Sequence, residues 1–350
     1  MVQQAQELGV MDLPPIGMGC WSYGGGEYWG KQNQHDVNDM VHLALDLGVN
    51  FFDTAEAYND GKSETSLAAA LKGKRDRAIV CSKVSPCHTQ PRQLREHCEG
   101  SLKRLGMDYL DLYMIHWPIN GLSIRHFTQD RRLIQNPPSV HQAFDTLMSL
   151  KKEGKIRAVG VSNFGPKQLR EALDTGAEVS VNETAYNILS RAIEAEIIPF
   201  CLKNNIAIIG SMTLMQGVLA GTYLKAEDIP PHQAHSRHFA HHRGGGHSRH
   251  EEDGCEAEVF KALKQLRALA EDQRCSMAAL AIAWVLSKPG IHCALLGSRN
   301  KQELLDNVSA VHIKPDASII AAIDDLSLPV LRLLGNNPDY YENGSRPRSW

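Results

Sequence analysis

Short apolar segments alternate with helical patterns along most of the chain, and this alternation limits the possible folds more than any other feature. Eight segments have the length and apolar or β-branched character of strands: 16–21, 49–53, 78–84, 109–116, 156–162, 178–182, 206–211 and 293–298. Strands that alternate with helices indicate a parallel sheet with helical crossovers. Eight such units predict an α/β fold of the closed (β/α)8 type, a TIM barrel, with an open doubly wound sheet as the alternative.

The chain is expected to form one barrel domain over residues 1–350, because 350 residues suffice for a barrel with additions at its loops. Two stretches interrupt the alternation as insertions, a polar one at 120–138 and one rich in His, Arg and Gly at 223–255. Insertions of this length usually form lids or disordered loops. A polar C-terminal tail begins at residue 335.

Composition excludes several classes of partner. The net charge of −3 gives no electrostatic reason to expect nucleic acid or an anionic membrane surface as a ligand. No apolar run approaches the ~20 residues that span a bilayer, and the N-terminus lacks the pattern of a secretory signal. The eight cysteines form no Cys-x-x-Cys pair and are read as reduced thiols, so we expect a cytoplasmic protein.

Four side chains of complementary chemistry follow three successive strands. Asp53 and Tyr58 come at and after the end of the second strand, Lys83 lies near the end of the third, and His116 ends the fourth. Because parallel strands of a barrel end at one mouth, we expect these groups to converge there. Each residue alone has an ordinary structural explanation, so the prediction depends on their combination.

The combination suits proton transfer to a carbonyl. A tyrosine has a pKa of about 10, and a neighbouring ammonium favours its ionised form. We therefore expect Tyr58 to act as general acid, with Lys83 as its charge partner and Asp53 orienting Lys83. His116 would position the carbonyl oxygen of a small carbonyl or sugar substrate, and a nicotinamide would supply the hydride.

At these residues the chain resembles the aldo-keto reductases. The resemblance extends from about residue 16 to residue 310, and its matching stretches are 48–58, 63–64, 82–83, 104–113, 116–118, 154–164 and 296–300. It implies a (β/α)8 barrel that binds NADP(H), less often NAD(H), without a Rossmann fold. It also implies that Asp53, Tyr58, Lys83 and His116 form the catalytic tetrad of the family.

The resemblance implies cofactor contacts as well. Ser162 and Asn163 would hold the nicotinamide carboxamide, with Cys20 and Trp21 beside the cofactor. Two positions depart from the family pattern: Glu183 stands where a Gln is usual, and Ser211 stands where the family has an aromatic residue beneath the nicotinamide. A carboxylate accepts from the carboxamide NH2 but cannot donate to its oxygen. The stretch after Ser211, with Leu214 and Gly217, fits the phosphate loop that follows.

The last strand is followed by a predicted phosphate site. Gly297, Ser298 and Arg299 are expected to open the last barrel helix, and helix N-termini attract phosphate. Arg299 adds a cation suited to a 2′-phosphate, which favours NADP as cofactor and leaves NAD possible. Glu303 and Asn307 would face the adenine end.

Two tryptophans, Trp29 and Trp117, are predicted to wall the substrate pocket, with packing at the barrel rim as the alternative. The histidine-rich segment 232–250 is interpreted as a cofactor lid in which Arg237 or Arg243 reaches the pyrophosphate. No metal site is expected in the chain, and in this segment flexible glycines and interspersed arginines argue against a preformed one.

The function predicted from these residues is an NADP(H)-dependent oxidoreductase that reduces aldehydes or ketones, or oxidises sugar alcohols or aldoses. Two alternatives stay open. One is a non-catalytic regulatory module that binds the cofactor. The other is a sugar-modifying enzyme that retains its cofactor and catalyses a net elimination or isomerisation. The sequence gives no prediction of oligomeric state.

Overall fold

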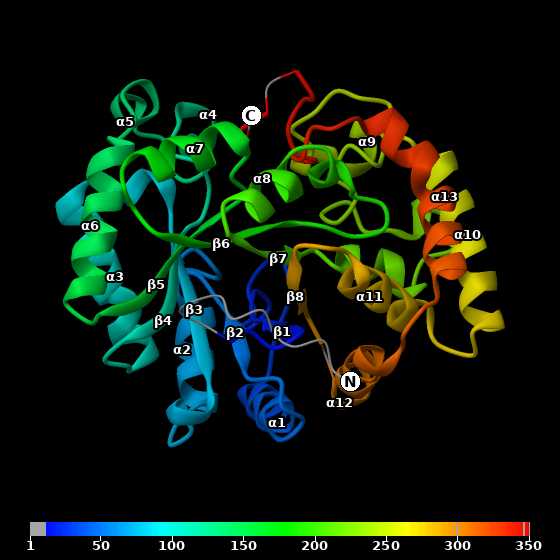
Figure 1. The fold of residues 1–350 in the computed structure, drawn as a ribbon, viewed down its shortest axis with the longest axis horizontal. Helices are drawn as coiled ribbons and strands as arrows, with labels where there is room; N and C mark the ends of the chain where they lie inside the picture. The colour runs from blue at the N-terminus through cyan, green and yellow to red at the C-terminus, as the bar shows by residue number, and fades with distance from the viewer. Residues whose placement is uncertain (1–11, 299, 346, 350) are drawn as a thin grey trace.

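Eight parallel strands close into a barrel in the order of the sequence, which confirms the predicted (β/α)8 fold (Figure 1). The computed structural model describes residues 12–298, 300–345 and 347–349. The strands are β1 (Ile16–Gly19), β2 (Phe51–Asp53), β3 (Ile79–Val84), β4 (Leu110–Ile115), β5 (Ile156–Ser162), β6 (Val179–Ala185), β7 (Ala207–Ser211) and β8 (Ile291–Leu296).

Helices surround the barrel and fill the connections. The α-helices are α1 (Gln34–Asp46), α2 (Lys62–Ala70), α3 (Pro91–Leu105), α4 (Gly121–Ile124), α5 (Arg131–Gln135), α6 (Val140–Lys152), α7 (Pro166–Asp174), α8 (Ile197–Lys203), α9 (His241–Gly244), α10 (Glu256–Asp272), α11 (Met277–Ser287), α12 (Lys301–Ser309) and α13 (Ala317–Leu334). The 3₁₀ helices are η1 (Arg75–Arg77), η2 (Pro86–His88), η3 (Ala192–Glu194), η4 (Met215–Ala220), η5 (Ala226–Asp228), η6 (Gly245–His247) and η7 (Ala310–His312).

The inside of the barrel is filled by alternate residues of the strands. Leu112 and Met114 of β4 lie in this inner cluster, as do Ala207 and Ile209 of β7. Successive residues of a strand point to opposite faces, so the residues between them pack outward against the helices. This explains why the strands are mainly apolar, since both of their faces are buried, with Asp53, Lys83 and Glu183 among the polar exceptions.

Barrel closure depends on close packing at β1. Its Gly17 pairs with Phe51 of β2 and with Leu295 of β8. A Cβ atom on Gly17 would lie 2.5 Å from the ring of Phe51 and 2.9 Å from Leu295 Cδ2. A larger residue would therefore displace the side chains that fill the inner layer.

Several element ends differ from the sequence-based expectation; β1, for example, ends at Gly19 rather than at residue 21. Strand β6 extends to Ala185 rather than ending at residue 182, because its residues pair in register with β7 as far as Ser211. Strand β8 begins at Ile291, two residues before the predicted start at 293. The last barrel helix, α12, begins at Lys301 behind an Asn300 cap, so Gly297 and Ser298 precede the helix instead of opening it.

The two segments read as insertions contain short helices. Residues 120–138 include α4 and α5, and residues 223–255 include η5, α9 and η6. The C-terminal tail joins both segments, because Glu342 makes ion pairs with Arg125 and Arg249. In Figure 1 the red tail lies beside α9. Among the described residues, none of the helices has the length and apolar character required to cross a membrane.

Candidate active site

The carboxyl ends of β2, β3 and β4 bring the four predicted catalytic residues together. Asp53 is the last residue of β2, Lys83 lies one residue before the end of β3, and His116 directly follows β4. Tyr58 lies in the loop after β2, where its backbone N–H donates to Ala55 O. The parallel register of the strands therefore sets the spacing of the group.

Lys83 is the centre of the cluster. Its fully buried ammonium donates to the Asp53 carboxylate, to Thr54 O at 3.2 Å and to the Tyr58 hydroxyl at 3.3 Å. Burial alone would lower the pKa of Lys83, but the Asp53 and Glu183 carboxylates raise it well above its usual value. The ammonium is therefore charged throughout the physiological pH range.

Tyr58 carries its proton in this environment. Burial raises the pKa of Tyr58 well above its usual value, and the Lys83 ammonium opposes that rise. The ammonium acts in the direction expected from the sequence, but desolvation is the larger effect. The hydroxyl is therefore a phenol at neutral pH, the form that a general acid requires.

His116 is a neutral imidazole beside Tyr58. The two ring centroids lie 5.4 Å apart in an edge-to-face arrangement. Burial, helped by the Lys83 cation, lowers the pKa of His116 to about 3. Its buried Nδ1 atom has no hydrogen-bond partner among the described residues. A neutral ring with an unused polar atom is suited to bind a substrate or cofactor group.

Glu183 adds a second carboxylate to Lys83. It lies in β6, where its Oε2 is 3.3 Å from Lys83 Nζ, and its side chain is buried. Burial raises the pKa of Glu183 to about 8, and repulsion from Asp53 adds to the effect while Lys83 opposes it. This contact with the centre of the cluster was not predicted from the sequence.

Ser162 and Asn163 lie at the end of β5, next to the cluster. Asn163 donates from Nδ2 to His116 O at 3.2 Å and to Ser162 Oγ at 2.9 Å. Its backbone has a positive φ of 62°. Non-glycine residues in this region are often found at functional sites, where the surrounding structure maintains the strain.

Aromatic side chains extend the site from the β1 side. Trp21 stacks on Tyr28 at 4.9 Å, contacts Trp29 edge-on at 5.2 Å and lies 6.0 Å from the Tyr58 ring. Cys20, in contrast, is fully buried, and its thiol donates to the carbonyl of Met18. Trp29 is thus linked to the Tyr58 side of the site through Trp21, and its role as a wall of the substrate pocket stays a prediction.

The loop after β7 has an unusual backbone. Ser211 ends β7, and Leu214 precedes η4, in which Met215, Gln216 and Gly217 have positive φ angles of 45°, 53° and 95°. Three successive positive φ angles change the direction of the chain. This backbone conformation costs free energy at Met215 and Gln216, which have side chains. Strain of this kind is consistent with a loop shaped for a ligand.

The residues after β8 are partly held by one another. Asn307 donates from Nδ2 to Ser298 Oγ at 3.1 Å, and both side chains are buried. The Glu303 N–H donates to Asn300 Oδ1 at 2.9 Å, and Glu303 Oε1 accepts from Asn300 Nδ2 at 3.1 Å. Glu303 thus completes the cap of α12. Gly297 has open space where a Cβ would lie, and Arg299 is outside the described residues.

The two arginines expected to reach a pyrophosphate have other partners. Arg237 is buried and donates to backbone carbonyls of the C-terminal region, those of Leu334, Asn337 and Asp339. Arg243 pairs with Glu227 and Glu256. Segment 232–250 is therefore tied through Arg237 to the C-terminal region, and the expected reach of either arginine to a pyrophosphate stays a prediction.

The tail contributes one residue that sequence reasoning missed. The guanidinium of Arg348 lies 3.5 Å above the ring of Trp117, and a buried Asp339 carboxylate pairs with it at 2.8 Å. Trp117 adjoins His116, so the tail reaches the edge of the cluster. The residue types alone gave no signal, because Arg348 is more than 200 positions away from Trp117.

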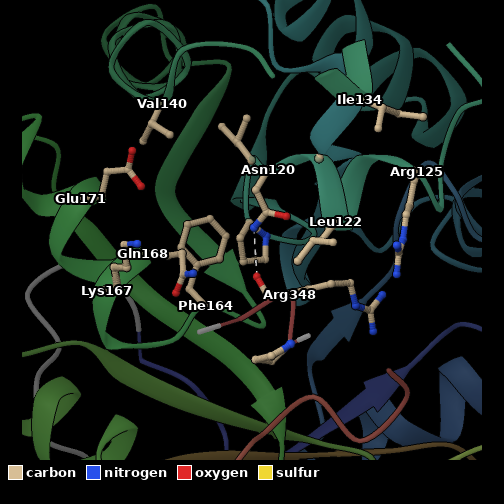
Figure 2. Close-up of a pocket in the computed structure, with 14 residues that line it drawn as sticks. Asn120, Leu122, Arg125, Ile134, Val140, Phe164, Lys167, Gln168, Glu171 and Arg348 are labelled. Atoms are coloured by element: carbon tan, nitrogen blue, oxygen red, sulfur yellow. Dashed lines mark hydrogen bonds between the residues drawn. The ribbon is translucent and has the colours of Figure 1, made fainter. Parts of the chain in front are cut away.

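A cavity of about 530 Å³ opens beside the site (Figure 2). Its wall includes Leu122, Ile134 and Phe164, and Asn120 crosses it to donate to Arg348 O at 3.0 Å. Phe164 directly follows Asn163, and the cavity thus borders the carboxyl ends of β4 and β5. None of the four tetrad residues, and neither Trp29 nor Trp117, lines this cavity.

Curated relatives align with most of the chain. An NADH-specific methylglyoxal reductase from Escherichia coli (strain K12) is 30% identical over 328 residues, which cover 87% of this chain and 93% of the relative. The aldo-keto reductase YhdN from Bacillus subtilis (strain 168) is 30% identical over 305 residues, covering 83% and 82%.

Solved structures share the barrel. An aldo-keto reductase from Klebsiella pneumoniae in complex with NADPH is 25% identical with a TM-score of 0.67, covering 90% of this chain and 91% of that one. The glycerol dehydrogenase from Gluconobacter oxydans is 25% identical with a TM-score of 0.74, covering 94% of both chains. The sequence model of the Aldo/keto reductase family matches residues 15–328, and this protein therefore belongs to that family.

Proposed function

We propose that this protein is an NADP(H)-dependent oxidoreductase that reduces small aldehydes or ketones, or oxidises sugar alcohols or aldoses, with Tyr58 as general acid and base. The observation that carries the proposal is the position of the Lys83 ammonium, bonded to Asp53 and 3.3 Å from the Tyr58 hydroxyl. Two relatives named as methylglyoxal reductases support a small carbonyl substrate.

The described residues fit a nicotinamide dinucleotide. Ser162 and Asn163 present polar side chains next to His116, and the strained loop at Gln216 and Gly217 has a non-helical backbone directly after β7. A bound nicotinamide would supply the hydride. The comparisons do not decide between NADP and NAD, because one relative is named as NADH-specific and one neighbouring structure contains NADPH. The proposed preference for NADP therefore depends on Arg299.

The residues of the chain have distinct proposed roles. Tyr58 gives its proton to the carbonyl oxygen, and Lys83 stabilises the phenolate that results. Asp53 holds Lys83 in place through a charge-assisted hydrogen bond. His116, being neutral, donates a hydrogen bond to the same oxygen without competing for the proton. Positioning and proton transfer together provide the rate enhancement expected of such a site.

Purified protein mixed with NADPH or NADH and a panel that includes methylglyoxal and glyceraldehyde tests this proposal. We expect loss of cofactor absorbance with at least one aldehyde. Tyr58→Phe should reduce kcat by at least ~10²-fold, the range of general acid catalysis, while cofactor binding measured by fluorescence stays within about twofold. Tyr109→Phe serves as the matched control, because Tyr109 packs beneath Arg75 and Arg157 outside the cluster.

Each contrary outcome identifies an alternative. More than a few per cent of activity in Tyr58→Phe would remove Tyr58 as the acid. Tight cofactor binding without turnover on any carbonyl would favour a regulatory module. Conversion of a sugar without net consumption of cofactor would favour an enzyme that retains its cofactor through a transient oxidation.

A further inference from the structure

One carboxylate lies between two imidazoles on the side of the loop that carries Tyr58. Glu56 Oε1 is 2.8 Å from His88 Nδ1, and Glu56 Oε2 is 2.7 Å from His97 Nδ1. The two rings stack with centroids 3.7 Å apart and planes inclined by 16°. One ligating atom from each residue lies within 4.8 Å of the other two. Both imidazoles thus direct the same nitrogen to the same carboxylate.

Three separate elements hold this group. Glu56 lies in the loop after β2, His88 ends η2 after β3, and His97 lies in the middle of α3. The backbone N–H of Ser85 donates to Glu56 Oε1 at 2.9 Å and fixes the carboxylate. Glu56 is buried, whereas each histidine side chain is 33% exposed. The site is therefore rigid on its inner side and accessible to ions from solvent.

The carboxylate is ionised at all ordinary pH values. Burial on its own would raise the pKa of Glu56, but the hydrogen bonds from His88, His97 and Ser85 outweigh it and hold the pKa well below its usual range. A metal ligand must be deprotonated, so the carboxylate is ready to bind a cation, whereas each imidazole must first move its Nδ1 proton to Nε2 or release it.

We propose that Glu56, His88 and His97 bind one divalent transition-metal ion, best matched by zinc. Two imidazole nitrogens and a carboxylate oxygen form a three-residue set that leaves a further position for water, and their bonds to zinc are about 2.0–2.2 Å long. Ligand atoms on one tetrahedral zinc lie about 3.4 Å apart, so small rotations of the rings bring the observed atoms into range. Calcium and magnesium prefer oxygen ligands, and the two imidazoles therefore disfavour them.

The proposed metal site is separate from the cluster around Lys83 but shares a loop with it. Glu56 lies two residues before Tyr58, and its backbone N–H donates to Lys83 O at 3.2 Å. A metal ion would therefore connect α3 to the loop that carries Tyr58. The proposal does not depend on the catalytic role of Tyr58, since it concerns metal binding alone. The proposal departs from the sequence-based expectation that the chain has no metal ligands, because that expectation considered only the histidine-rich segment 232–250 as a candidate.

Zinc binding to untagged, chelator-treated protein tests the proposal directly. The affinity is measured by competition with a chromophoric chelator, and cobalt(II) absorption reports the coordination. We expect one zinc ion per chain and a thermal midpoint that rises with zinc. His88→Ala and His97→Ala should each weaken binding at least about tenfold, because loss of a group that merely supports a ligand already costs about 10–100-fold.

Two kinds of control separate ligand loss from other effects. His88→Gln and His97→Gln keep an amide donor for Glu56 but are poor metal ligands, so they should fold normally and still lose zinc. His232→Ala/His247→Ala removes a pair of rings 6.4 Å apart in the histidine-rich segment and should bind as the parent protein does. Zinc affinity unchanged in the His88 and His97 variants, or lost only in the His232/His247 variant, overturns the proposal. Absence of measurable zinc binding to the parent protein does so as well.

Discussion

Lys83 is the residue on which the proposed chemistry depends, and it has one more acidic neighbour than the family resemblance predicted. Asp53 and Glu183 both contact its ammonium, so a buried group of three charges has a net negative charge when both carboxylates are ionised. Because Glu183 has a pKa raised to about 8, this net charge changes within an accessible pH range. When Glu183 is ionised, its negative charge raises the pKa of Tyr58 further, and Tyr58 becomes a weaker acid.

Glu183→Gln should therefore extend reduction to higher pH. In the parent protein, kcat for reduction should fall as the pH rises through about 8, where Glu183 ionises. In the variant this component of the profile should be absent, because the amide does not titrate. A series of kcat measurements from pH 6 to 9 checks this, and Glu178→Gln, on an exposed ion pair, is the control. Superimposable profiles for Glu183→Gln and the parent would remove Glu183 from this role.

Stability provides an independent measurement on the same variant. In the folded state the pKa of Glu183 is raised to about 8, so the side chain keeps its proton up to that pH. In the unfolded chain the proton is released near the ordinary Glu pKa of about 4.3. The stabilisation that comes with this proton is complete below the lower value and lost as the pH rises through the upper one. The thermal midpoint of the parent should therefore fall relative to that of Glu183→Gln between about pH 5 and 8. Midpoints that keep a constant difference over this range would contradict the raised pKa.

The tetrad residues could be selected from sequence because each lies at or near the end of a strand, and parallel strands end at one edge. Glu183 in contact with Lys83, and Glu56 between His88 and His97, could not be selected in the same way. Their partners lie far apart in the sequence, and contact requires the register of strands and the rotation of helices. A pattern of residue types contains neither.

At the scale of elements, the strands were more predictable than the starts of helices. All eight strands follow from runs that are mainly apolar or β-branched, because both faces of a barrel strand are buried. The helical stretch expected at 301–308 matches α12, and Asn300 and Glu303 form the Asn-x-x-Glu capping pattern that marks Lys301 as its first residue. The predicted phosphate-site residues Gly297 and Ser298 precede this helix instead of opening it. The short helices α4, α5 and α9 lie in polar segments, where hydrophobic periodicity gives little information.

The position of α12 leads to a prediction about Arg299, which stands two residues before the helix. A cation beside a helix N-terminus is suited to the 2′-phosphate that distinguishes NADPH from NADH. We expect Arg299→Ala to weaken NADPH binding at least about tenfold, comparable with the loss of a bond to a charged group, and to change NADH binding little. Equal losses for both cofactors, measured by fluorescence titration, would refute the assignment. Lys301→Ala is the control, since Lys301 pairs with Asp39.

At the scale of the whole molecule, the tail connects parts of the structure that are distant in sequence. Arg348 and Asp339 form a buried ion pair, and Glu342 pairs with residues of both insertion segments. Removing one partner of a buried pair costs about 3–5 kcal/mol, because it leaves an unpaired charge. The tail can respond by detaching locally, so the effect should appear there before the barrel unfolds.

Asp339→Asn should therefore expose the tail without unfolding the barrel. We expect hydrogen exchange within residues 337–349 to accelerate by at least about tenfold, whereas exchange in the barrel strands stays unchanged. Glu96→Gln, on the exposed pair with Arg92, should change neither. Protection of the tail equal to that of the parent would show that the pair does not hold it.

Acid should act on the tail in the same way. Burial would raise the pKa of Asp339, but Arg348 lowers it below its usual value. The stabilisation from this carboxylate is thus complete above the unfolded pKa of about 3.9 and is lost as the pH falls through the folded one. Release of the tail in the parent protein should begin below about pH 4.

The pairing of the first strand with the last has a consequence for how this protein is made. β1 accepts β8 as a neighbour, so one edge of the growing sheet has no permanent partner until almost all of the described chain has left the ribosome. An open strand edge is a site for association with other chains. We therefore expect the nascent chain to keep an unpaired strand edge, open to association with other chains, until β8 has paired with β1.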